Sequence, residues 1–272
     1  MSTTPPGRTY RLLLIASAAT FAATVLFSLG GIALMRHAPI FAARAGGLLP
    51  WLMKVPTWLN LTALPLVVFL IYVRVLGTKA SVFFLVWGSF VGMMAELIGT
   101  GTGYPFGEYA YTAFLNPKIM GAVPFFIPLS WYAVSALSLD FAARLDLPRG
   151  QRILVAALYM VLWDVALDPA MGMGFPIWEW RVEGFFYGMP ALNWVGWYGT
   201  SLVLVWGYEI LGGGPPRTSS RWPMWIWIAN GALSVGICAL AGLGAAVLAG
   251  AVALAIPLLA LWRRTPDQRP AA

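Results

Sequence analysis

Eight apolar segments divide the sequence, and each is long enough to cross a lipid bilayer as a helix. Short turns rich in Gly and Pro separate several of them, such as the run 212–216. The segments cover about residues 11–35, 57–76, 80–98, 123–143, 151–168, 193–211, 222–241 and 243–262. The sequence therefore predicts an all-α fold, a polytopic transmembrane bundle of about eight spanning helices.

The composition favours one domain that lies within the membrane. Charged residues make up only 10% of the 272 residues, against about 25% in soluble domains. We interpret 1–272 as a single integral-membrane domain, with a motif-bearing core over roughly 60–210 and scaffold helices after 222.

The run Leu12–Met35 exceeds the length of a signal-peptide core, so we interpret it as a retained first helix. Phe41–Lys54 is expected to be a short interfacial helix.

Charge and residue counts exclude several classes of function. The net charge of +7 is spread between the apolar segments, which indicates topology signals and no nucleic-acid partner. A single histidine, His37, argues against a histidine metal site or a catalytic triad. Cys238 is the only cysteine, so no internal disulfide can form.

The distribution of Lys and Arg predicts the orientation. Most of the 17 basic residues lie in the tails and even-numbered loops, which places both termini in the cytoplasm of a multi-pass protein of the inner or plasma membrane. The long loops 99–122 and 169–192 then lie on the outer side. They are rich in Gly, Pro and aromatic residues, and we expect them to fold back as a cap.

The two loops also resemble each other. Gly101–Tyr109 reads GTGYPFGEY and Gly172–Trp180 reads GMGFPIWEW. An internal duplication of a helix–loop–helix unit is one explanation. Coincidence in a chain with so many Gly, Pro and aromatic residues is the preferred one, since the flanking helices do not align.

Acidic residues within apolar segments are costly, so each one is a candidate functional group. Asp140 precedes Arg144 by one helical turn, and Glu209 lies near a basic loop, so both are interpreted as structural. Glu96 differs, because it continues a stripe of Gly88 and Gly92 at a spacing of four residues. Such a small-residue face packs against another helix, which points Glu96 into the bundle.

Asp164 and Asp168 are four residues apart and share one helix face. Pro169 favours the end of the helix there, so Asp168 is expected at the outer mouth and Asp164 one turn deeper. Two like charges in a low dielectric favour a protonated carboxyl, which is a Brønsted acid ready for use. In the predicted topology Glu96 and Asn193 lie at the same end, and the capping loops add aromatic side chains. These features predict one site.

The predicted site suits proton chemistry on an apolar molecule. An acid that protonates an alkene, beside aromatic rings that stabilise the resulting cation, is a coherent device. The run GTGTG lacks the strand–turn–helix context of a dinucleotide fingerprint.

An ordered string of motifs resembles the CruF-type carotenoid 1,2-hydratase family over roughly residues 60–210. The motifs are Glu96-x-x-Gly99-x-x-Thr102-Gly103-x-Pro105-Phe106-Gly107-x-Tyr109-x-Tyr111, Trp163-Asp164-x-x-x-Asp168-Pro169, Trp178-x-Trp180 and Tyr187-Gly188-x-Pro190-x-x-Asn193-Trp194-x-Gly196-Trp197. The resemblance implies carotenoid biosynthesis by a hydro-lyase, which adds water to the terminal isoprenoid double bond of an acyclic end group to give a tertiary alcohol. No cofactor or metal is implied. The partners are water, membrane lipid and a lipophilic carotenoid that enters from the bilayer.

The buried acids and these motifs together predict the site residues. The catalytic candidates are Asp164, Asp168 and Glu96, with the assignment of acid and base left open. Asn193 and Tyr109 are expected to hold the attacking water. The full set of expected substrate-binding and water-binding residues is Asn193, Tyr109, Tyr111, Thr102, Trp163, Trp178 and Tyr187.

Two other functions fit part of the pattern. A membrane isoprenoid or carotenoid cyclase would use the same acid and let an internal alkene capture the cation. A lipid-binding or transport protein would use the acids to bind cations or carry protons, and the absence of a mid-helix Gly/Pro break beside the acids disfavours it.

Overall fold

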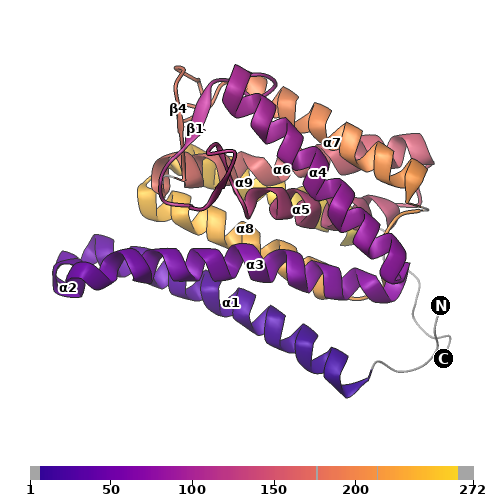
Figure 1. Cartoon of the computed structure of the whole chain (residues 1–272), viewed down its shortest axis with the longest axis horizontal. Coiled ribbons are helices and arrows are strands. Elements are labelled where there is room, and N and C mark those ends of the chain that lie inside the picture. Colours follow the sequence, from indigo (N-terminus) through magenta and orange to yellow (C-terminus); the bar gives the residue numbers. More distant parts are fainter. Residues whose placement is uncertain (1–6, 176, 213, 263–272) are drawn as a thin grey trace.

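The computed structural model describes residues 7–262 except 176 and 213. In this part of the chain, eight long helices and one short helix form a bundle, which confirms the predicted all-α class (Figure 1). The helices are α1 (Arg8–His37), α2 (Pro39–Ala45), α3 (Leu49–Leu76), α4 (Thr78–Thr102), α5 (Ile127–Ala143), α6 (Arg149–Pro169), α7 (Ala191–Leu211), α8 (Trp222–Ala241) and α9 (Gly244–Trp262). The shorter elements are the turns η1 (Gly46–Leu48) and η2 (Ala170–Gly174) and the strands β1 (Tyr109–Tyr111), β2 (Lys118–Ile119), β3 (Val123–Pro124) and β4 (Trp178–Trp180).

Most of the long helices have the length and apolar character of membrane spans. Six helical segments of the described chain are long and apolar enough to cross a bilayer, with Pro39–Leu76 counted as one segment. Helix α5 is apolar but shorter. The cytoplasmic placement of the termini stays a prediction, because the bundle alone does not give its orientation in a membrane.

The segment after α1 differs from the expected interfacial helix Phe41–Lys54. Helix α2 covers only Pro39–Ala45, and the residues from Leu49 onward already belong to α3. Gly46 has a φ of +49°, a conformation that glycine adopts at little cost and that separates the two helices. A proline in the first turn of α3 helps to set its start, since the fixed φ of proline suits that position.

Helix α5 lies at the centre of the bundle. Its residues from Trp131 to Ala143 are all buried, and α3, α4 and α6 pack around it. Helices α1 and α3 run beside each other, and α1 also contacts α8 (Figure 1). On the far side of α6, Gly250 of α9 approaches Ala166 so closely that an added Cβ would lie 2.4 Å from the Ala166 Cβ.

The two long loops meet over one end of the bundle. Strand β1 comes from the loop after α4, and β4 comes from the loop after α6. They pair antiparallel, with Tyr109 opposite Trp180 and Tyr111 opposite Trp178. In Figure 1 this ribbon and α2 lie at the same end of the molecule. The loops therefore cap the bundle as a pair, each one held by the other.

The ion pairs at the other end agree with the structural interpretation of two acids. Arg144 donates to Asp140 over 2.5 Å, and Tyr72 donates to the same carboxylate over 3.0 Å. Arg152 donates two hydrogen bonds of 2.7 Å to Glu209. Both carboxylates are thus satisfied by neighbouring groups.

Candidate functional site

Glu96 points into the bundle from the small-residue face of α4, as predicted. The buried residues of this helix include Gly88, Gly92, Glu96 and Gly99. A Cβ on Gly92 would lie 2.4 Å from Cγ of Trp131, so glycine is what lets α5 approach this closely. The close approach brings the indole of Trp131 within reach of the Glu96 carboxylate.

Three side chains hold the Glu96 carboxylate. Trp131 donates its indole N–H to Oε1 over 3.0 Å. The Tyr111 hydroxyl donates to Oε2 over 2.8 Å, and the Tyr109 hydroxyl donates to the same oxygen. Glu96 is only 6% exposed, so these bonds replace the water that the carboxylate loses.

Asp168 is held in the same manner on α6. The indole N–H groups of Trp180 and Trp178 donate to its Oδ1 over 2.9 and 3.2 Å. The side-chain amide of Asn193, near the start of α7, donates to its Oδ2 over 2.8 Å. Asp168 is 3% exposed, and it too accepts three hydrogen bonds.

The geometry of the ribbon explains why the two acids are held alike. Side chains two residues apart on a strand point to the same face. Tyr109 and Tyr111 of β1 therefore both point down to Glu96, the acid of the helix that precedes their strand. Trp178 and Trp180 of β4 do the same for Asp168. Two similar loops thus supply matching pairs of donors to the acids of two helices.

Asp164 lies one turn deeper than Asp168 and has fewer partners. Asn193 donates from Nδ2 to Oδ2 of Asp164 over 2.9 Å, and the same nitrogen bonds Asp168. The other oxygen of Asp164, Oδ1, is buried and has no hydrogen-bond partner among the described residues. Asp164 is only 1% exposed, so solvent does not replace the missing hydrogen bonds. Of the three carboxyls, it has the fewest hydrogen bonds from the described residues.

The three carboxyls line one cavity of about 60 Å³. This exceeds the 10–15 Å³ or so that one water molecule needs. The wall is largely aromatic, and the Trp131 and Trp197 rings stack in it with centroids 4.2 Å apart. The remaining lining residues are Phe106, Tyr109, Tyr111, Ile127, Ser130, Leu167, Trp178, Trp180 and Asn193. The predicted convergence of acids and aromatic loops on one site agrees with this geometry.

The two tyrosines of β1 stay neutral donors. Burial, followed by the neighbouring Glu96 charge, raises the pKa of Tyr111 well above its usual value of 10. The pKa of Tyr109 is raised for the same two reasons. Both phenols therefore remain protonated at physiological pH and serve Glu96 as donors.

Three predicted residues lie outside this cavity. Thr102 is exposed at the end of α4, where its hydroxyl donates to the Ile98 carbonyl over 2.7 Å. The Tyr187 hydroxyl accepts a bond from the backbone N–H of Ala245 over 3.1 Å. Trp163 is buried against Trp227 and lines the neighbouring cavity. The other predicted residues, Asp164, Asp168, Glu96, Asn193, Tyr109, Tyr111 and Trp178, all line the carboxyl cavity.

Trp131 is the main hydrogen-bond donor to the acids that the sequence analysis did not identify. It lies in a largely apolar helix, where an aromatic side chain is ordinarily a packing residue. Trp180 belongs to the motif string, but only the structure shows its bond to Asp168. Among the described residues, no group of three or more His, Cys, Asp or Glu side chains is arranged to hold a metal ion.

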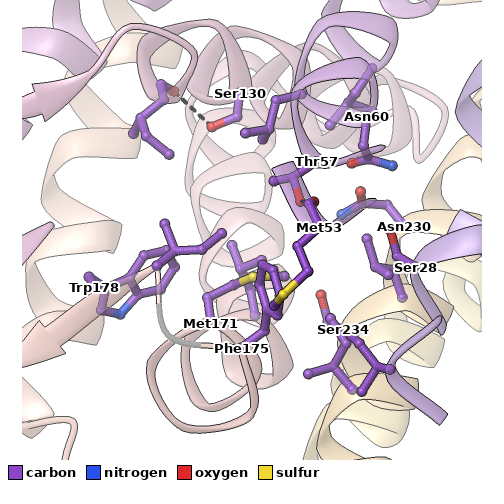
Figure 2. Close-up of a pocket in the computed structure, with 18 of the residues that line it drawn as sticks. Ser28, Met53, Thr57, Asn60, Ser130, Met171, Phe175, Trp178, Asn230 and Ser234 are labelled. Atoms are coloured by element: carbon purple, nitrogen blue, oxygen red, sulfur yellow. Dashed lines mark hydrogen bonds between the residues drawn. The ribbon is translucent and has the colours of Figure 1, made fainter. Parts of the chain in front are cut away.

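A second, larger cavity of about 130 Å³ adjoins the first. The two cavities share the lining residues Ile127, Ser130, Leu167, Trp178 and Trp197. Figure 2 shows Trp178, Met171 and Phe175 on one side of it, and Thr57, Asn60 and Asn230 on the other. Asn230 belongs to α8, so this helix contributes to a cavity wall as well as to the scaffold that the sequence predicted.

Comparison with known proteins agrees with this picture. A curated relative, bisanhydrobacterioruberin hydratase of Haloarcula japonica, is 34% identical over 115 residues. That region is 40% of this chain and only 38% of the relative. No solved structure matches the chain. The family described as "Carotenoid biosynthesis protein" matches residues 57–257, a span that contains all three carboxyls of the cavity. The chain therefore belongs to this family of carotenoid biosynthesis proteins, whose CruF-type hydratases it resembles.

Proposed function

We propose that this protein hydrates the terminal isoprenoid double bond of an acyclic carotenoid end group and produces a tertiary alcohol without a cofactor. One observation carries the proposal. Asp164 presents a buried oxygen that has no hydrogen-bond partner among the described residues. The same cavity is lined by two hydrogen-bonded carboxylates, Glu96 and Asp168, and by aromatic rings. The name of the relative, a hydratase, supports the same reaction.

The number of hydrogen bonds distinguishes the roles of the three acids. Glu96 and Asp168 each accept three bonds from N–H or O–H donors, which is the arrangement that holds a carboxylate. Among the described residues, Asp164 accepts one bond, and its Oδ1 has no hydrogen-bond partner. We therefore assign Asp164 as the proton donor, and Glu96 and Asp168 as the fixed negative groups.

The reaction starts with transfer of the Asp164 proton to the less substituted carbon of the double bond. The π electrons form the new C–H bond, and positive charge develops at the tertiary carbon. The two carboxylates and the indole rings of Trp131 and Trp197 stabilise this charge in a site from which bulk water is largely excluded.

Water then adds to the cation. Its oxygen forms the C–O bond, and the Asp168 carboxylate accepts the released proton. Asn193 bonds both Asp168 and Asp164, so the two carboxyls are held as neighbours. Return of the proton from Asp168 to Asp164 restores the starting state, and the net change is the addition of one water.

Incubation of the membrane-embedded protein with an acyclic carotenoid in ¹⁸O-labelled water tests this function. We expect a product that is heavier than the substrate by one labelled water. Asp164→Asn should give no product, whereas Glu179→Gln should be active, because Glu179 is exposed on the other face of β4. A product with the mass of the substrate would identify a cyclase, and an unchanged bound pigment would identify a binding protein.

A further inference from the structure

The two cavities at the carboxyl site continue into a third hollow at the surface. This outer groove of about 550 Å³ lies between α1, α2 and the start of α3. It shares Phe27, Gly31, Met35, Leu52 and Met53 with the 130 Å³ cavity. The carboxyl cavity, the middle cavity and the outer groove are thus consecutive, since each borders the next through common lining residues.

The mouth of the outer groove is largely apolar, with Arg44 as a charged lining residue. Exposed apolar side chains surround it, among them Phe27, Leu34, Phe41 and Leu52. Helices α1 and α3 have the length and composition of membrane spans, so these side chains meet lipid in a membrane. A molecule that enters here comes from the bilayer, without passing through water.

We propose that the three hollows form one channel, and that a long, linear, apolar polyene enters between α1 and α3 and reaches the carboxyls end first. This inference rests on the proposed function and adds the route and the shape of the substrate. The carboxyl cavity is too small for more than an end group, so the rest of the chain lies in the middle cavity and the groove.

Gly31 offers a direct way to block this channel. It lines both the middle cavity and the groove, and a Cβ built on it has no heavy atom within 4 Å. A tryptophan there projects into the hollow without a clash at its Cβ. Gly199 of α7 is the matched control, because its Cβ is equally unobstructed and it lines none of these three hollows.

The experiment compares purified wild type, Gly31→Trp and Gly199→Trp for co-purifying acyclic carotenoid and for product. We expect Gly31→Trp to lose bound pigment and product by about tenfold or more, because it fills space that the chain needs. Gly199→Trp should match wild type, and a short acyclic monoterpene alkene should still react with Gly31→Trp. Wild-type pigment binding and turnover by Gly31→Trp would overturn the route.

Failure of the route and failure of the hydratase function give different results. The wild type could bind pigment but release no hydrated product, while Gly31→Trp loses the bound pigment. This result would support the channel and refute the hydration.

If Gly31→Trp does not fold, Ser28→Cys provides a second test, since Ser28 lines the middle cavity and the native Cys238 is fully buried. Bound carotenoid should protect Ser28→Cys from an alkyl thiosulfonate but leave Gly199→Cys reactive. Equal reaction of Ser28→Cys with and without pigment would contradict the proposal.

Discussion

Tyr109 and Trp180 are paired across the β1–β4 ribbon, with ring centroids 5.4 Å apart, yet they bind different carboxylates. Tyr109 donates to Glu96 of α4, and Trp180 donates to Asp168 of α6. The ribbon therefore links two acids from separate helices through one cross-strand pair of residues. Single substitutions in the ribbon therefore test the hydrogen bonds to each acid separately.

The first prediction concerns Asp164. We expect Asp164→Asn to abolish hydration with little loss of thermal stability, because Oδ1 has no hydrogen-bond partner among the described residues. Product mass and Tm check the two parts of the prediction. Wild-type turnover would refute Asp164 as the donor. A large fall in Tm would mean that Oδ1 is bonded after all.

Asp168→Asn should behave differently. An amide nitrogen in place of one oxygen would meet N–H groups of Trp178, Trp180 or Asn193, and donors would then face donors. Each unsatisfied buried group costs about 1–3 kcal/mol, so we expect both a lower Tm and loss of product. A Tm equal to that of Asp164→Asn would contradict the assigned difference between the two acids.

The donors of the ribbon can be removed singly. Tyr109→Phe and Trp180→Phe each delete one bond to a carboxylate, and a bond to a charged group is worth about 1.5–3 kcal/mol. We expect turnover to fall roughly tenfold to a hundredfold in each, measured as initial rate of product formation. Tyr104→Phe is the control, since Tyr104 is 69% exposed at the surface of the same loop. An equal loss in Tyr104→Phe would indicate a general effect of loop changes.

Close packing of α4 on α5 also supports the site. A Cβ on Gly92 would lie 2.4 Å from Trp131 Cγ, so Gly92→Ala should destabilise the protein by about 1–3 kcal/mol and displace Trp131 from Glu96. Thermal unfolding and turnover should both decline. Gly101→Ala in the same helix has no heavy atom within 4 Å of its Cβ and should leave both unchanged. A neutral Gly92→Ala would show that α5 can move away without harm.

Sequence patterns gave the helices and the acids for local physical reasons. Apolar length predicts a span, and a spacing of four residues puts Asp164 and Asp168 on one face. The Gly88, Gly92 and Glu96 stripe likewise predicts that Glu96 faces a neighbouring helix. These properties depend only on residues close together in the chain.

Contacts between distant segments depend on the tertiary structure. Trp131 lies 35 residues from Glu96, and only the packing of α5 on α4 brings its indole to the carboxylate. The pairing of β1 with β4 joins loops that share a pattern, but a register of three residue pairs is too short to read from composition. The Asp164 oxygen without a partner in the described part of the chain, and the hollow along Gly31, both depend on how many distant side chains pack together. No local sequence pattern predicts such packing. The sequence by itself thus determined which helices form and which acids they carry inward, whereas the packing of those helices decided which donors each acid meets and where space is left for a substrate.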